Sequence, residues 1–264
     1  RPLMVLKLNV AFSDNPRVQP LKDGTVKPEG IELNFITTTP GWIFHRNLYY
    51  DEFDVSEMSI SSTFLAVERR SGTGKWDWSA LPVFLSSGGL VWVTRAYVNA
   101  NSGIRTLADV KGKRIGVPDY EMTAALWMKI VMKDMFGIEA RDNVWINGRT
   151  KELSRDNALG LDIDPPPGVE RQWLKEGQHM DVMLESGEVD AAFIMTPADI
   201  QGMGPSGIES EGYTVTMERG GGTQTAGNPR IRRLFADEGK AIVTEYHQKF
   251  GHRHQPNHHL VIQN

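Results

Sequence analysis

The stretch from Leu107 to Trp127, LADVKGKRIGVPDYEMTAALW, constrains the fold of this chain more than any other. It predicts a helical turn over 107–110, a Lys-Gly-Lys turn, a buried strand over 114–117, a loop broken by Pro118 and a helix that begins at Thr123. In an open α/β sheet, ligands bind beyond the carboxyl ends of strands, where the start of a helix offers unpaired N–H groups to an anion. The stretch therefore predicts an α/β fold with an anion-binding loop.

Composition narrows the class of partner. The 264 residues are 40% hydrophobic and 23% charged, which is ordinary globular composition for one large or two smaller domains. The net charge of -4 at pH 7 comes without acidic or basic blocks, so nucleic acid is not expected as a partner. No apolar run approaches the roughly 18 residues of a membrane span, so membrane insertion is not expected either. We expect a small-molecule ligand, aromatic or anionic, and a homo-oligomer stays open.

The absence of cysteine excludes disulfides, thiolate nucleophiles and cysteine metal sites. The first residues, RPLMVLKLNVAF, lead directly into strand-like sequence without a small-residue cleavage site, so the chain as given has no export signal. Since it begins at Arg1, a removed signal stays open. We expect a cytoplasmic protein if the chain is an enzyme, and a periplasmic or extracytoplasmic one if it only binds a solute.

Strand and helix patterns alternate along the chain, which is typical of βα units. Before the polar, turn-rich segment 99–103 we expect strands at 3–12, 31–35, 53–55, 81–85 and 90–94 and helices at 41–50 and 63–70. After it we expect strands at 114–117, 144–146, 191–194 and 258–263 and helices at 123–136, 179–186 and 230–250. Because a final strand without a following helix is unusual, we expect the native chain to continue past Asn264.

Polar residues that follow strands are the candidates for ligand binding. Asp14 and Arg17 lie in the loop after the first strand, and Arg149 follows the strand at 144–146. A guanidinium group can bind a carboxylate through two hydrogen bonds, although an ordinary surface arginine fits both positions as well. Ser59 and Ser61 lie where a strand runs into a helix, and they either bind an anion or cap the helix.

Tyr120 follows the break at Pro118, where we expect its side chain to be exposed and to face a ligand. Five histidines crowd the end of the chain without a recognised zinc spacing, so we expect no metal. His259, at the start of a buried strand, is the best placed to carry a proton, because imidazole titrates near neutral pH, and a hydrogen-bonded structural histidine is the alternative. The sequence GMGPSG at 202–207 matches the dinucleotide fingerprint, but its proline and the lack of a following helix argue against a nucleotide site.

With these residues laid out, the chain resembles the 4,5-dihydroxyphthalate decarboxylase family, which is built like type 2 periplasmic solute-binding proteins. The segments that carry the resemblance are DGTV at 23–26, PEGI at 28–31, FDVSEMS at 53–59, KRIGVP at 113–118 and MTAALW at 122–127. The segment FDVSEMS and the pattern Pro-x-Tyr-x-Met-Thr-Ala-Ala-x-Trp are the most specific. The loop Ser86 to Gly89 is shorter than the family's and lacks the basic residues usual there.

The resemblance implies a two-lobed α/β fold with a ligand cleft between the lobes. Lobe I would comprise residues 1–97, lobe II residues 98–255, and a return strand to lobe I residues 256–264. It further implies a decarboxylase of a dihydroxylated aromatic dicarboxylate, such as 4,5-dihydroxyphthalate, that yields protocatechuate and CO₂ without a cofactor. The alternative is a non-catalytic solute-binding protein of an ABC transporter.

In the enzyme hypothesis, His259 or Glu57 donates the proton that replaces the leaving carboxylate. The substrate-binding residues would be Asp14, Arg17, Ser59, Ser61, Tyr120, Thr123 and Arg149.

Overall fold

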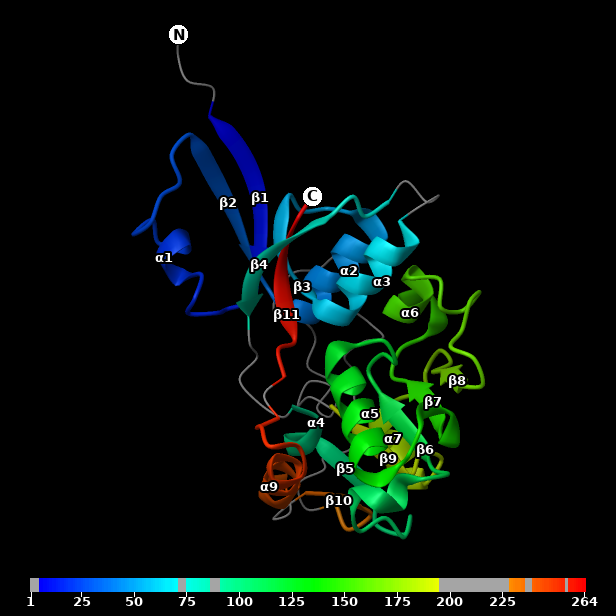
Figure 1. Ribbon diagram of the computed structural model, residues 1–264. Coiled ribbons are helices and arrows are strands. Elements are labelled where there is room, and N and C mark those ends of the chain that lie inside the picture. Colours follow the sequence, from blue (N-terminus) through cyan, green and yellow to red (C-terminus); the bar gives the residue numbers. More distant parts are fainter. Residues whose placement is uncertain (1–4, 71–74, 86–90, 195–227, 236–238, 255) are drawn as a thin grey trace. The chain divides into compact units, whose positions relative to one another are not determined.

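The computed structural model describes residues 5–70, 75–85, 91–194, 228–235, 239–254 and 256–264. Its chain divides into two compact units (Figure 1): Arg1–Ser87 with Asn257–Asn264 form unit 1, and Gly88–Pro256 form unit 2. The strand Ala96–Asn99 (β5) pairs with strands of the second sheet, so the first boundary lies before it rather than after residue 97.

Unit 1 contains a five-stranded sheet in the order β2-β1-β3-β11-β4. Its strands are Leu6–Phe12 (β1), Ile31–Thr37 (β2), Val55–Ser59 (β3), Ser79–Leu85 (β4) and His259–Gln263 (β11). The first three strands run parallel, whereas β11 is antiparallel to both of its neighbours, β3 and β4. Figure 1 shows β11, in red, among strands from the start of the chain. The last strand thus joins the sheet next to β3.

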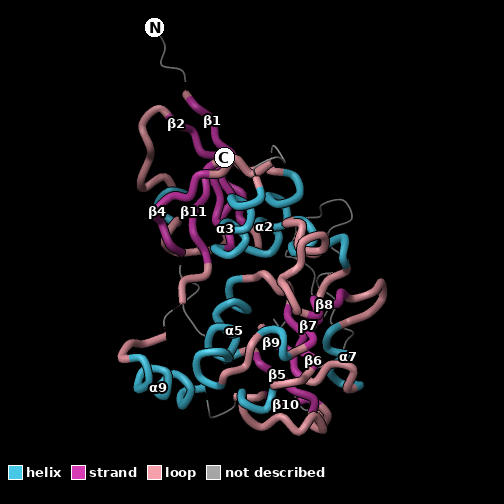
Figure 2. The backbone as a smooth tube through the Cα atoms, turned by 45° about the vertical axis from the view of Figure 1, so that its right-hand side comes forward, coloured by secondary structure: helices cyan, strands magenta, loops and turns pink. Residues whose placement is uncertain are grey.

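In the described part of unit 1, three helices accompany this sheet: Gln19–Lys22 (α1), Pro40–Tyr50 (α2) and Ile60–Arg69 (α3). Helix α2 begins at Pro40, whose fixed φ suits the first helical position, and it ends at Asp51 in a left-handed conformation with φ of 51°. Trp42, Ile43 and Leu48 are buried on it. Helices α2 and α3 lie next to each other beside the sheet (Figures 1 and 2). Helix α3 follows β3 without an intervening loop, so the carboxyl end of β3 is also the start of a helix.

Unit 2 contains a six-stranded sheet in the order β10-β5-β9-β6-β7-β8. Its other strands are Arg114–Val117 (β6), Val144–Asn147 (β7), Glu170–Trp173 (β8), Ala191–Phe193 (β9) and Ile231–Arg233 (β10). Strands β9, β6, β7 and β8 run parallel, and β5 is antiparallel to β9 and β10. The carboxyl ends of β6 and β7 therefore meet at one edge of this sheet.

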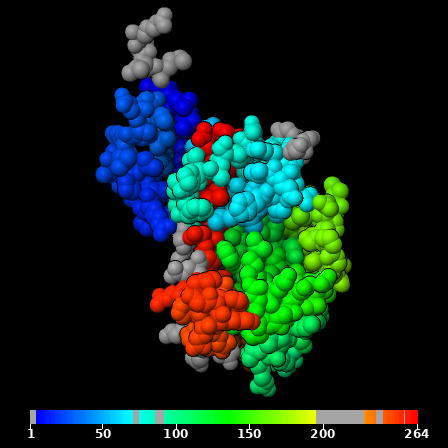
Figure 3. All heavy atoms as spheres, viewed as in Figure 1, coloured from blue at the N-terminus to red at the C-terminus, as the bar shows by residue number. Residues whose placement is uncertain are grey.

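The α-helices among the described residues of unit 2 are Val91–Thr94 (α4), Thr123–Phe136 (α5), Arg155–Ala158 (α6), Met180–Ser186 (α7) and Gly239–Phe250 (α9). Short 3-10 turns lie at Leu107–Val110, Ala140–Asp142 and Lys151–Leu153. Gly137 follows the last residue of α5 and ends the helix. Its φ of 66° lies in the left-handed region, which glycine adopts without strain. In the space-filling view, α9, in orange, lies at the surface of this unit (Figure 3). Among the described residues, no helix has both the length and the apolar character to cross a membrane.

The predicted α/β architecture is confirmed, and the structure shows one sheet in each of its two units, but two of the expected elements were wrong. Residues 91–94 are a helix rather than part of a strand, and a strand that was not expected, β5, follows and ends where the expected exit loop at 99–103 begins. The expected helix at 230–250 is shorter, because residues 231–233 form β10 and α9 begins only at Gly239. The fingerprint-like residues 202–207 and the loop 86–89 lie outside the described residues.

Candidate functional site

In unit 1, strand pairing brings Glu57 and His259 to the same face of the sheet. Val261 lies opposite Glu57 and His259 lies opposite Ser59 in the antiparallel register of β11 and β3. Opposite residues in such a pair share a face, as do residues two apart on one strand. Nδ1 of His259 accordingly lies 3.1 Å from Oε2 of Glu57. The two residues proposed for proton transfer therefore form one hydrogen-bonded pair.

The carboxylate of Glu57 is almost completely buried, with 1% of its surface exposed. Its Oε1 accepts a hydrogen bond from the backbone N–H of Ser13, and its Oε2 contacts His259. Burial alone raises the pKa of Glu57, but the hydrogen bond and charge of His259, together with the Ser13 hydrogen bond, outweigh burial and hold the pKa below its ordinary value. Glu57 is therefore ionised at neutral pH.

The imidazole of His259 keeps 18% of its side-chain surface exposed. The ring of Phe44 from α2 packs edge-on against the imidazole, with centroids 4.9 Å apart and planes at 84°, and this contact restricts the rotation of the imidazole. An ionised carboxylate can only accept hydrogen bonds, so Nδ1 carries the proton toward Glu57. Nε2 lies on the other side of the ring and is the nitrogen that can exchange a proton with a bound molecule.

Ser59 and Ser61 are buried where β3 passes into α3, and their hydroxyl oxygens lie 3.2 Å apart. The hydroxyl of Thr63 donates a hydrogen bond to the carbonyl oxygen of Ser59 at 2.8 Å, which fixes this first turn. Ser59 shares the sheet face of Glu57 and His259. Neutral hydroxyl donors therefore lie close to the Glu57–His259 pair.

Asp14 and Arg17 lie elsewhere on unit 1. The Asp14 side chain is 92% exposed and pairs with Lys22 at 3.7 Å. The exposed Arg17 donates a hydrogen bond from Nη1 to the carbonyl oxygen of Phe84 at 3.4 Å. Within the described residues, no hydrogen bond or ion pair joins either side chain to Glu57 or His259. Their assignment to substrate binding stays a prediction.

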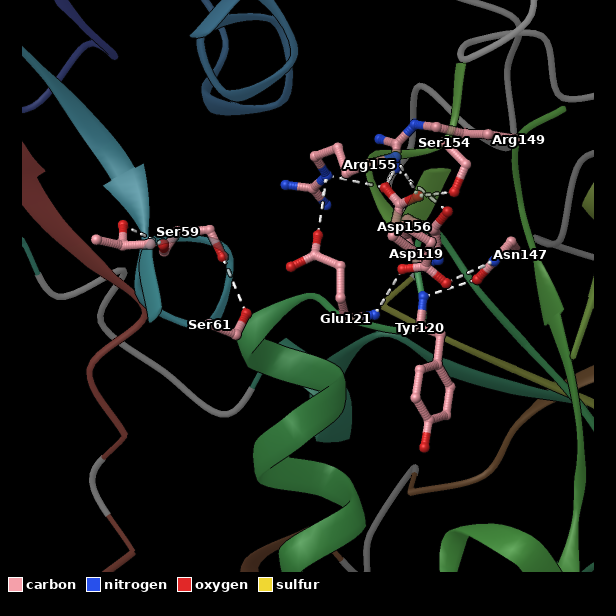
Figure 4. A network of polar contacts seen from close by, with 12 residues as sticks. Ser59, Ser61, Asp119, Tyr120, Glu121, Asn147, Arg149, Ser154, Arg155 and Asp156 are labelled. Atoms are coloured by element: carbon pink, nitrogen blue, oxygen red, sulfur yellow. Dashed lines mark hydrogen bonds and ion pairs between the residues drawn. The ribbon is translucent and has the colours of Figure 1, made fainter. Parts of the chain in front are cut away.

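In unit 2, a buried ionic cluster lies beyond the carboxyl ends of β6 and β7 (Figure 4). Asp119, which has no exposed surface, is its centre. Oδ1 of Asp119 accepts hydrogen bonds from the Ser154 hydroxyl at 2.9 Å and from the Arg155 backbone N–H at 3.0 Å. Its Oδ2 pairs with Nε of Arg155 at 2.9 Å and with Arg149. One carboxylate thus orients two buried guanidinium groups.

A second ring of contacts fixes the loop that carries Asp119. The amide oxygen of Asn147 accepts the Tyr120 backbone N–H at 2.7 Å, and its Nδ2 donates to Asp156 at 2.9 Å. Asp156 also accepts the backbone N–H of Glu121 at 3.0 Å and pairs with Arg171 at 2.8 Å. The Glu121 carboxylate lies 3.4 Å from Nε of Arg155. The loop after β6 is thereby held by side chains from β7, α6 and β8.

Tyr120 corrects the sequence expectation. It is 7% exposed, not open to solvent, and its ring packs against Trp145 with centroids 5.4 Å apart. Burial, offset in part by Arg171 and reinforced by Asp156, raises the pKa of its hydroxyl to about 12. Pro118 breaks the strand, but the chain then turns the tyrosine into the core. Thr123 is placed as expected, as the first residue of α5, and it is buried.

Sequence reasoning missed Asp119, Arg155 and the backbone N–H of Ser13. Asp119 follows directly after the predicted strand end at Pro118, and Ser154-Arg155 opens a helix, so both positions carried a usable signal. The contacts that Asp119 and the Ser13 N–H make with distant segments could not be predicted from the sequence, because they depend on which strands are neighbours in the sheet. Among the described residues, no group of three or more histidine or acidic side chains could hold a metal ion.

Comparison with known proteins identifies relatives by sequence. A 4,5-dihydroxyphthalate decarboxylase from Comamonas testosteroni is 30% identical over 244 residues, which are 92% of this chain and 64% of that protein. A 4,5-dihydroxyphthalate decarboxylase from Pseudomonas putida is 34% identical over 192 residues, which are 72% of this chain and 71% of that protein. The chain thus spans less than two thirds of the Comamonas protein. No family model matches the chain.

Solved structures with a similar chain path include sulfonate-binding proteins. The alkanesulfonate-binding protein SsuA from Xanthomonas axonopodis pv. citri aligns with a TM-score of 0.47 and 13% identity over 98% of this chain and 65% of that chain. The periplasmic aliphatic sulphonate binding protein SsuA from Escherichia coli aligns with a TM-score of 0.48 and 11% identity over the same shares.

Proposed function

Because the chain belongs to the 4,5-dihydroxyphthalate decarboxylase family, we propose that it removes one carboxylate from a dihydroxylated aromatic dicarboxylate such as 4,5-dihydroxyphthalate. The products would be protocatechuate and CO₂. Among the residues of this chain, the main support for the proposal is the hydrogen bond between the buried Glu57 and His259. A decarboxylase of this kind needs a group that delivers a proton to carbon, and an oriented imidazole is such a group.

His259 acts as the general acid in the proposed reaction. A ring hydroxyl para to the leaving carboxylate supplies electron density, and Nε2–H of protonated His259 delivers a proton to the ring carbon that bears this carboxylate. The bond from ring to carboxylate then breaks, its electron pair restores the aromatic ring, and CO₂ leaves. The reaction exchanges one carboxylate for one proton, which His259 regains from solvent.

Glu57 positions His259 and is not itself the donor in this scheme. Its Oε2 accepts from Nδ1, which fixes the ring orientation and leaves Nε2 for the substrate. As an ionised group, it also places a negative charge beside the imidazole. The backbone N–H of Ser13 donates a hydrogen bond to the other carboxylate oxygen, which fixes the position of the Glu57 carboxylate.

The hydroxyls of Ser59 and Ser61 are proposed to contact the carboxylate that leaves. They are neutral donors, and a carboxylate that is only weakly solvated loses CO₂ more easily than one bound by a cation. Arg149, whose guanidinium pairs with Asp119 within unit 2, stays a predicted carboxylate-binding residue, because a guanidinium binds carboxylates in two-point fashion. Asp14, Arg17, Tyr120 and Thr123 remain further predictions. We also propose a cytoplasmic location for this enzyme.

The test is a direct assay of the purified chain. Incubation with 4,5-dihydroxyphthalate should release CO₂ and protocatechuate in equal amounts. Phthalate, which lacks the hydroxyls, should bind without releasing CO₂, because nothing then supplies electrons to the ring. Binding of 4,5-dihydroxyphthalate without turnover would contradict the enzyme proposal and support the solute-binding alternative.

A further inference from the structure

The hydrogen bond to Glu57 fixes one atom of the His259 ring, Nδ1. The ring is also attached to the chain through Cβ, and these two points define an axis about which the ring plane can tilt. Nε2 lies off this axis, so the hydrogen bond by itself leaves the direction of Nε2 undefined. A general acid must be aligned with the atom that it protonates, because a displacement of about 1 Å can cost a factor of about 10² in rate. A third contact is therefore needed to orient Nε2.

Phe44 supplies this third contact. Its ring meets the imidazole of His259 edge-on, with planes at 84° and centroids 4.9 Å apart. This separation lies within the range of about 4.5–7 Å that aromatic pairs prefer. Phe44 is 3% exposed, so the surrounding core keeps its ring in place. A tilt of the imidazole would either push it into the Phe44 ring or lose the contact.

Helix α2 presents Phe44 from a fixed position, because it is tied to the strand that carries Glu57. The helix packs against β3 (Figure 1). Asn47, about one turn after Phe44, has no exposed surface, and its Nδ2 donates a hydrogen bond to the hydroxyl of Ser56. Ser56 directly precedes Glu57 in β3. The element that carries Phe44 and the strand that carries Glu57 thus share a buried hydrogen bond.

Two tryptophans hold the other end of α2. The indole N–H of Trp76 donates to the carbonyl oxygen of Leu48 at 3.1 Å, and that of Trp78 donates to the Asp51 carboxylate at 2.7 Å. Both tryptophans are buried. Trp76 has φ of 58°, in the left-handed region that a bulky residue rarely adopts. An unfavourable backbone conformation therefore occurs at the residue whose indole fixes α2.

We propose that Phe44 is a positioning residue for the decarboxylation, because its ring sets the direction in which Nε2 of His259 points. This inference rests on the proposed function, in which His259 is the proton donor. Phe44 acts through the imidazole and not on the substrate. Removal of its ring should therefore slow proton delivery and leave substrate affinity unchanged.

The first test is the turnover of 4,5-dihydroxyphthalate by Phe44→Leu. The value of kcat should fall about threefold to tenfold, because the imidazole then spreads over several staggered rotamers. The dissociation constant of phthalate should stay within about threefold of the wild type. Ile43→Val, at the neighbouring buried residue of α2, is the matched control and should keep the wild-type kcat. If Phe44→Leu does not fold, Phe44→Met takes its place, because methionine adapts well to the shape of a core.

The tautomer of His259 supplies a second readout, which does not depend on turnover. Since Glu57 accepts a hydrogen bond from Nδ1, the neutral imidazole of the wild type should carry its proton on Nδ1. Nitrogen-15 spectra at about pH 8.5, where an ordinary imidazole is neutral, report the tautomer, and His259→Gln identifies the signals. Part of the Phe44→Leu protein should convert to the Nε2–H tautomer, whereas Ile43→Val should keep the wild-type spectrum.

Retention of the wild-type kcat by Phe44→Leu overturns the inference, whatever its spectrum. An unchanged Nδ1–H tautomer also overturns it, because a fall in kcat then has another cause. An equal fall in kcat for Ile43→Val would show that any loosening of α2 has this effect. If the wild type releases no CO₂, the proposed function fails by itself, and the tautomer alone decides whether Phe44 orients the imidazole.

Discussion

The imidazole of His259 and the carboxylate of Glu57 are hydrogen-bonded at 3.1 Å, although 202 residues separate them in the sequence. The antiparallel pairing of β11 with β3 brings them together, so neither segment can form this pair alone. Glu57 is fixed from a third segment as well, because the backbone N–H of Ser13 donates to its other oxygen. Folding of unit 1 is thus a condition for orienting the proposed proton donor.

Removal of the Glu57 charge should change the pH dependence of stability. The pKa of Glu57 in the folded chain lies below its ordinary value of 4.5, so its ionisation contributes stability that is fully present above about pH 5 and is lost as the pH falls through the lower folded pKa. Denaturant unfolding of Glu57→Gln should show a loss of about 1–3 kcal/mol at pH 7. Its stability should also fall less steeply than that of the wild type below pH 5.

Glu32→Gln is the control for this experiment, because Glu32 lies in the same sheet with 59% of its side chain exposed. Its variant should track the wild type within about 0.5 kcal/mol at every pH. Curves for Glu57→Gln and the wild type that run parallel from pH 7 to pH 3 would disprove the linkage.

Asp119→Asn should be one of the most destabilising single changes in unit 2. Asp119 has no exposed surface and compensates the charges of Arg149 and Arg155. Breaking a buried ion pair leaves uncompensated charge in the interior, at a cost of about 3–5 kcal/mol. Denaturant unfolding measures this loss. Asp14→Asn, at a 92% exposed side chain, should cost less than about 0.5 kcal/mol, and a similar small cost at Asp119 would refute the claim.

Gly116 in β6 should be intolerant of a side chain because Met180 packs against it. A Cβ built at Gly116 would clash with the Met180 sulfur and lie 2.8 Å from its terminal methyl carbon. Gly116→Ala should therefore cost about 1–3 kcal/mol in denaturant unfolding. In a Met180→Ala background the same change should cost clearly less, because the clash is gone. Strictly additive effects of the two substitutions would show that Met180 is not the cause.

Local patterns predicted much of the fold. The turn over 107–110, the strand over 114–117 and the helix from Thr123 to the stop at Gly137 all occur as expected, because each has its own turn, hydrophobic or capping signal. The pattern failed at 90–94, where four apolar residues followed by a threonine fit a helix or a strand equally well. It failed again at 231–233, where pairing with β5 overrides the helical pattern.

The candidate site was less accessible to sequence reasoning. His259 and Glu57 were chosen separately by residue chemistry, and only the strand order shows that they touch. Tyr120 was expected to be exposed since it follows a proline, but packing against Trp145 and Lys129 buries it. Arg149 was predicted without its partner, because the contact with Asp119 joins the ends of two neighbouring strands. Contacts of this kind follow from topology rather than from local sequence.

The most direct test of the proposed mechanism is the turnover of 4,5-dihydroxyphthalate by His259→Gln. Loss of a general acid typically costs a factor of about 10²–10⁴ in rate, so kcat should fall by that factor. The affinity for phthalate, measured by calorimetry, should stay within about threefold of the wild type, because other groups bind the carboxylates. His252→Gln, at an exposed histidine, should keep the wild-type kcat. Retention of the full rate by His259→Gln would contradict the assignment of His259 as the proton donor.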